Sequence, residues 1–190
     1  MKKDSILKNN KGYSLVEFII VFGIIVIFAG AATITLSVMH SAKAKEAGTK
    51  FESELAELSA KAKSESCVVS GTVMSDYKFA LRIYKNADGK YYLKHVYYVG
   101  MGDMSSASNY VDGDDNPNGG KGISLSTYVT VKYEDSSGNK SAVDNNGKFI
   151  IFDRKGMCIS GDGKYSFYKT SGGGKVAEVK ISKNGSRQSR

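Results

Sequence analysis

A long stretch without charge constrains this chain more than any other feature. No side chain from Phe18 to Ala42 is charged. At ~1.5 Å per residue, a helix of this length reaches roughly 38 Å, which exceeds the ~30 Å hydrocarbon core of a bilayer. The run therefore predicts a transmembrane helix over about residues 18–42.

The charges on either side of this run predict its orientation. Four lysines and one aspartate precede the run, at Lys2, Lys3, Lys8, Lys11 and Asp4. Positive residues favour the cytoplasmic side of a membrane. The chain is thus expected to be a single-pass membrane protein with its N-terminus in the cytoplasm and everything after about Lys43 outside it.

A compact motif joins the basic segment to the apolar run. It reads Lys11-Gly12-Tyr13-Ser14-Leu15-Val16-Glu17-Phe18. Its carboxylate, Glu17, stands at the edge of a segment where a charge is costly, and carboxylates in such places usually have a function.

This motif resembles the N-terminus of the type IV pilin and type II secretion pseudopilin family. The resemblance implies that residues 1–12 are a leader, which a prepilin peptidase cuts after Gly12. It also implies N-methylation of Tyr13, which stands where Phe is commoner, and a role for Glu17, the fifth mature residue, in filament assembly. The implied partners are the peptidase, other pilin or pseudopilin subunits and the inner or cytoplasmic membrane.

Cleavage would change the electrostatics of this end. It removes four lysines and one aspartate, which lowers the formal charge from +8 to +5. It also leaves a free ammonium on Tyr13, one helical turn before Glu17. The resemblance implies that Glu17 meets the ammonium of a neighbouring subunit and so sets the register of the filament. The alternative is that Glu17 pairs with the ammonium of its own Tyr13.

Two other interpretations of the N-terminus are weaker. One is an uncleaved signal-anchor with an incidental Glu17. The other is a secretory signal cut within the Ala-rich patch 29–32, although such signals have a shorter apolar core followed by the cut site.

The helix is expected to continue beyond the membrane. Apolar residues recur at three- and four-residue spacing and form one stripe: Ala44, Ala47, Phe51, Leu55, Leu58 and Ala62. Opposite charges four residues apart predict the surface pairs Glu46/Lys50, Lys50/Glu54 and Glu57/Lys61. We predict one helix over 13–63, half in the membrane and half packed on a soluble domain.

The remaining chain alternates with period two between turn-forming residues, which is typical of strands. The clearest hairpin joins 76–85 to 90–99, and 123–133 is expected to be one strand. The predicted class is α+β, with a long N-terminal helix packed on an antiparallel β-rich head over 64–182. The polar segment 183–190 is expected to be a disordered tail.

A second resemblance concerns the C-terminal part. Phe149 to Gly156, then Ser160 to Phe167, Lys175 to Ile181 and Asn184 to Arg187, look like the end of the H-type minor pseudopilins. Ser186 interrupts the Gly-Arg ending of that pattern, and ordinary β-hairpins give similar sequences.

Candidates for chemistry are few. Asp112, Asp114 and Asn116 alternate as oxygen ligands for Ca²⁺ do, but the positions that an EF-hand requires as Gly and Glu hold Pro117 and Ile123. A solvated turn is the stronger interpretation, so we expect no metal and no cofactor.

Cys67 and Cys158 are the two cysteines of the chain. Outside the cytoplasm they are free to form a disulfide, worth roughly 4–5 kcal/mol on the chain-entropy model. Two buried free thiols are the alternative.

No catalytic constellation emerges, so the chain is not expected to be an enzyme. The alternatives to a filament subunit are a membrane-tethered ligand-binding β domain and a DNA-capturing minor pilin of a competence system. The second would use positive charge and stacking by tyrosines 77, 84, 91, 92, 97 and 98, if these are exposed.

Overall fold

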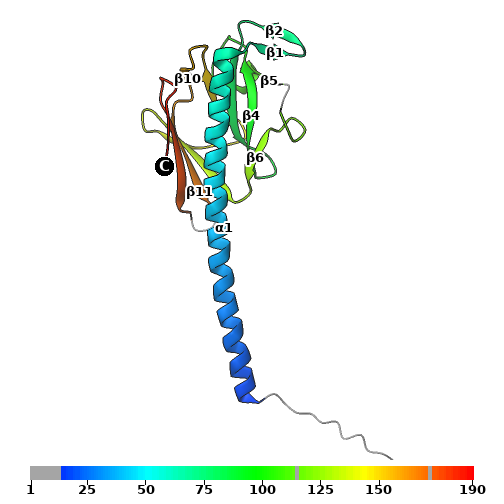
Figure 1. Ribbon diagram of the computed structural model, residues 1–190, viewed down its shortest axis with the longest axis vertical. Coiled ribbons are helices and arrows are strands. Elements are labelled where there is room, and N and C mark those ends of the chain that lie inside the picture. Colours follow the sequence, from blue (N-terminus) through cyan, green and yellow to red (C-terminus); the bar gives the residue numbers. More distant parts are fainter. Residues whose placement is uncertain (1–13, 114–115, 171–172) are drawn as a thin grey trace, which may run out of the picture. The chain divides into compact units, whose positions relative to one another are not determined.

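The computed structural model describes residues 14–113, 116–170 and 173–190. It divides into two compact units, residues 1–38 and 39–190. One helix, α1 (Leu15–Ser64), begins in the first unit and ends in the second. The helix expected over 13–63 is therefore confirmed within one or two residues. The second unit, which we call the head, consists of the last part of α1 and the strands that follow it (Figure 1).

The head contains three antiparallel sheets. A small hairpin of β1 (Cys67–Val69) and β2 (Thr72–Met74) follows the helix directly. The second sheet has the order β10-β9-β3-β4-β5, with β6 also paired to β4, and the third has the order β13-β12-β11-β7-β8. These findings agree with the α+β class.

The second sheet includes the predicted hairpin. The strands of this sheet are β3 (Lys78–Lys85), β4 (Tyr91–Tyr98), β5 (Tyr110–Asp112), β6 (Ile123–Ser126), β9 (Lys148–Phe152) and β10 (Cys158–Ser160). Strands β3 and β4 pair from Lys78↔Tyr98 to Lys85↔Tyr91, which confirms that hairpin. A short 3₁₀ helix, η1 (Ala107–Asn109), precedes β5.

The third sheet is built from later segments. Its strands are β7 (Val129–Asp135), β8 (Lys140–Ala142), β11 (Gly163–Lys169), β12 (Lys175–Ile181) and β13 (Arg187–Ser189). The expectation of a disordered tail over 183–190 is wrong, because β13 pairs with β12 over Val179–Ile181. The turn 182–186 folds the tail back onto the sheet edge, with Ser182 N–H donating to the Ser186 carbonyl at 3.0 Å.

The predicted strand over 123–133 is two strands. Strand β6 pairs with β4 in the second sheet, whereas β7 pairs with β11 in the third. The chain changes sheets at Ser126, whose φ of 155° few residues with a side chain adopt. Both halves carry apolar residues facing the core, so the sequence pattern does not reveal the break.

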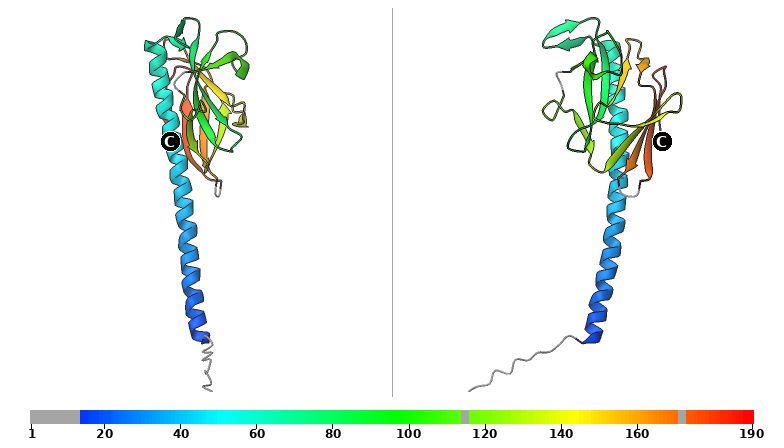
Figure 2. Two further views of the ribbon diagram at one scale, coloured as in Figure 1. Left: turned by 90° about the vertical axis from the view of Figure 1, so that its right-hand side faces the viewer. Right: turned by 180° about the vertical axis from the view of Figure 1, so that it is seen from behind.

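The core lies between the head part of α1 and the two larger sheets, which lie on the same side of the helix (Figure 2). The predicted helical stripe is buried along its whole length, and Phe51 packs against Tyr165 and Phe167 with ring centroids 4.9 and 5.6 Å apart. A smaller cluster covers the other face of the second sheet, around Val96 and Ile151.

At Gly48 the helix lies close to the third sheet. A Cβ atom at this position would stand 2.9 Å from the Cβ of Ala177 on β12. The helix therefore packs directly on the side chains of Ala177 and Phe167 at this point, and a glycine is what allows it.

Candidate assembly and membrane site on the N-terminal helix

Glu17 closes a capping box at the start of α1. The backbone N–H of Ser14 donates to Oε2 of Glu17 at 2.8 Å, and the N–H of Glu17 donates to Oγ of Ser14 at 3.1 Å. These reciprocal bonds satisfy two of the N–H groups that a helix start leaves unpaired. The Ser-x-x-Glu spacing is visible in the sequence, but we did not predict the box from it.

The predicted processing residues Gly12 and Tyr13 lie outside the described part of the chain. The structure therefore locates Glu17 relative to Ser14, and the two alternatives for its ammonium partner both stay predictions.

The first part of α1 exposes apolar side chains on all its faces. Every residue from Ser14 to Leu36 is exposed, and the exposed fractions of Phe18, Phe22 and Phe28 are 65, 59 and 70%. Within the described chain, α1 is the one helix long and apolar enough to cross a bilayer. A helix that is apolar all round is stable when lipid or other apolar helices surround it.

The polar part of α1 carries ion pairs at its surface. Glu46 accepts from Lys43 and Lys50, each at 2.8 Å, and Lys61 pairs with Glu57 at 2.9 Å. The two lysines hold the pKa of Glu46 down at about 2. Two of the three predicted pairs are thus confirmed.

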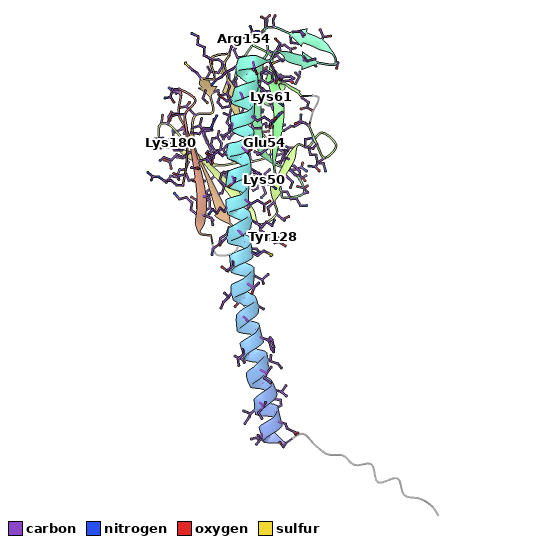
Figure 3. All side chains as sticks on the ribbon, in the orientation of Figure 1. Lys50, Glu54, Lys61, Tyr128, Arg154 and Lys180 are labelled. Atoms are coloured by element: carbon purple, nitrogen blue, oxygen red, sulfur yellow. The ribbon has the colours of Figure 1, made fainter. Side chains whose placement is uncertain are left out.

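The third predicted pair, Lys50/Glu54, is wrong. Glu54 instead contacts Nε2 of His95 on β4 at 2.8 Å, and both side chains are mostly buried. Glu54 lies on the side of α1 that faces the second sheet, so its nearest partner comes from the sheet. Figure 3 shows Lys50, Glu54 and Lys61 along this part of the helix.

The calcium candidates have structural partners. Oδ1 of Asn116 accepts the N–H of His95 at 2.8 Å, and its Nδ2 donates to the carbonyls of His95 and Gly113 at 2.7 and 2.8 Å. Asp112 pairs with Lys94 at 2.8 Å, and Asp114 lies outside the described residues. Asn116 thus ties Gly113 and the start of the 116–122 segment to β4.

Both cysteines are buried free thiols. Burial raises the pKa of Cys67 to about 11 and that of Cys158 to about 12. The predicted disulfide is absent from the structure, and the alternative of two buried thiols holds. Spacing in the sequence cannot decide between them, since a disulfide depends on the distance and direction of the two Cβ atoms.

One contact links a loop of the head to the helix near the end of the uncharged run. The rings of His40 and Tyr128 stack with their centroids 4.4 Å apart and their planes 17° apart. Nδ1 of His40 is buried and has no hydrogen-bond partner among the described residues. Tyr128 belongs to the short segment between β6 and β7, and no sequence pattern pointed to it.

A cavity lies at the other end of the head. It measures about 790 Å³ and is lined by the end of α1, β3 and the turn after β9, including Tyr77, Phe79 and Arg154. Arg154 donates to the carbonyl of Ser75 at 3.4 Å, and Asp153 accepts two backbone N–H groups of its own turn. Arg154 and Asp153 are thus engaged with the backbone. No group of three His, Cys, Asp or Glu side chains in the described chain could hold a metal ion.

The tyrosines proposed for base stacking are mostly in the core. Tyr84, Tyr91, Tyr92 and Tyr98 are buried, and Tyr77 and Tyr97 are partly buried. Tyr84, Tyr91, Tyr92 and Tyr98 are therefore not available for base stacking, and only Tyr77 and Tyr97 of this set reach the surface in part.

Comparison with protein-family models, with curated proteins and with solved structures finds no match to this chain.

Proposed function

We propose that this chain is a structural subunit, a minor pilin or pseudopilin, of a type IV pilus or type II secretion-like filament. A prepilin peptidase cuts it after Gly12, and the helix that begins at Ser14 holds it in the membrane until it joins the filament. The H-like pseudopilin is the subtype that the C-terminal resemblance favours.

The main support for this proposal is the first part of α1, where a capped helix start is followed by exposed apolar side chains. A capped helix presents one carboxylate, Glu17, at its first turn, and the side chains then face outward on all sides as far as Leu36. Lipid can cover such a helix before assembly, and the helices of neighbouring subunits can cover it afterwards. A carboxylate that enters such surroundings needs a positive partner, because an uncompensated buried charge costs several kcal/mol.

The capping box provides a way to test the role of this charge. Glutamine also closes a capping box, so Glu17→Gln keeps the helix start and removes the charge. Ser14→Ala keeps the charge of Glu17 but removes the hydrogen bond that Oγ of Ser14 accepts. This loss should destabilise the helix start by about 1 kcal/mol.

The experiment follows leader cleavage and filament incorporation in cells with an active prepilin peptidase. We expect intact mass to show loss of residues 1–12, with or without one added methyl group, in all variants. Incorporation should fall strongly in Glu17→Gln and remain near normal in Ser14→Ala. A full-length mass would refute the proposal, and equal incorporation of both variants would refute the role of the charge.

A further inference from the structure

The surroundings of α1 change within a few residues at the end of the uncharged run. Val38 and Met39 are exposed, with exposed fractions of 64 and 39%, whereas Ala44 is completely buried under the head. The first charged side chain after Glu17 is Lys43. Before residue 39 the helix exposes apolar side chains, and from Ala44 onward the head covers it. The change takes place over residues 39–44.

The length of the helix places this change at a membrane surface. From Phe18 to Met39 the helix rises ~32 Å at ~1.5 Å per residue, close to the ~30 Å thickness of the hydrocarbon core. This step rests on the membrane span in the proposed function. With Glu17 at one edge of the hydrocarbon, His40 stands at the opposite edge, in the headgroup layer.

Tyr128 lies at the same level as His40, because the two rings stack. Two hydrogen bonds of the Tyr128 main chain hold this residue in place. Its N–H donates to Oγ of Ser126 at 3.2 Å, and its carbonyl accepts the N–H of Thr170 at 3.1 Å. The exposed fraction of Tyr128 is 42%, so the ring is not part of the head core. Figure 3 places it at the opposite end of the head from Arg154.

We propose that Tyr128 is a membrane anchor, which holds the head of the unassembled subunit on the phospholipid headgroup layer. Tyrosine suits this layer because its ring is apolar and its hydroxyl finds polar partners. The stack on His40 fixes the height of the ring relative to the helix.

The chain contains no tryptophan, so a single one reports its own depth. We would insert the full chain into phosphatidylcholine–phosphatidylglycerol vesicles with three variants, namely Tyr128→Trp, Phe28→Trp and Met101→Trp. Phe28 lies near the middle of the span, and Met101, which is 80% exposed, lines the cavity with Arg154. The quenchers are a nitroxide on the lipid headgroup and bromines deep on the acyl chain.

We expect the headgroup nitroxide to remove most of the emission of Trp at 128 and little of the emission of Trp at 101. The deep bromines should quench Trp at 28. Quenching at 28 without quenching at 128 would overturn the anchor and leave the span intact. Absence of quenching at 28 would refute the span itself, and with it the basis of the anchor.

Discussion

At the scale of single residues, Asn116, which the sequence suggested as a calcium ligand, instead holds the backbone of a loop in place. Its amide makes three hydrogen bonds to the backbone of His95 and Gly113. Oxygen ligands spaced along a loop suggested a cation site, yet the Asn116 amide already uses both its oxygen and its nitrogen to hold backbone groups of the head. The spacing of the residues was visible in the sequence, but their bonding partners 21 positions away were not.

We predict that Asn116→Ala lowers the stability of the head by about 1–3 kcal/mol, because it leaves partly buried backbone groups unpaired. Asn116→Asp should also be destabilising, since a carboxylate cannot donate to the two carbonyls. Thermal unfolding followed by circular dichroism, with and without Ca²⁺, measures both. A recovery of Asn116→Asp specifically on addition of Ca²⁺ would contradict the structural role and support a calcium site.

The two thiols lead to a second prediction at this scale. Because burial raises their pKa values to about 11 and about 12, fewer than ~1 in 1,000 are thiolates at pH 8, and the thiolate is the reactive form. We expect a maleimide to label neither cysteine in the folded protein and both after denaturation without reductant. Failure to label the denatured chain would show a disulfide instead.

At the scale of secondary-structure elements, the sequence predicted which segments form helices and strands better than it predicted which strands pair with each other. The helix, the β3–β4 hairpin and most later strands follow from periodicity and turn residues. The division of 123–133 between two sheets does not, because it depends on which neighbour each half meets. Strand β13 was missed for a related reason, since its three polar residues gain order from pairing with β12 rather than from their own composition.

The packing of α1 on β12 gives a prediction for Gly48. Gly48→Leu should destabilise the head by about 1–3 kcal/mol through overpacking, because even its Cβ would approach Ala177 to 2.9 Å. The matched control is Gly30→Leu, where no atom lies within 4 Å of a new Cβ. Chemical denaturation of the full chain in detergent measures the difference, and equal stability of the two variants would contradict the close packing.

At the scale of the whole molecule, the sequence predicted a membrane-spanning segment and a β-rich head with its own core. It did not predict the strand order, and it gave no sign of Tyr128, whose importance depends on contact with a helix residue 88 positions earlier. The assignment to a filament rests on the motif from Lys11 to Phe18, and on the exposed helix that follows it.

Buried tyrosines set the alkaline limit of the head. Burial raises the pKa of Tyr133 to about 12, and raises those of Tyr110 and Tyr165 as well. The unfolded chain loses these protons near pH 10, so stability is unaffected below that pH and falls as the pH rises toward the native values. We expect tyrosinate absorbance to rise together with loss of near-ultraviolet circular dichroism. The exposed tyrosines ionise near pH 10 in the folded protein, so ionisation of all twelve tyrosines near pH 10 with the dichroism unchanged would contradict this.

Because Cys67 and Cys158 are buried, we also expect the native protein not to react with thiol reagents. A cysteine introduced at an exposed position would then be the single site for a spin label or fluorophore, with both natural cysteines left in place. Pairs of such labels on separately prepared subunits would report distances across a filament. The packing of the core thus supplies a background on which subunit contacts can be mapped directly.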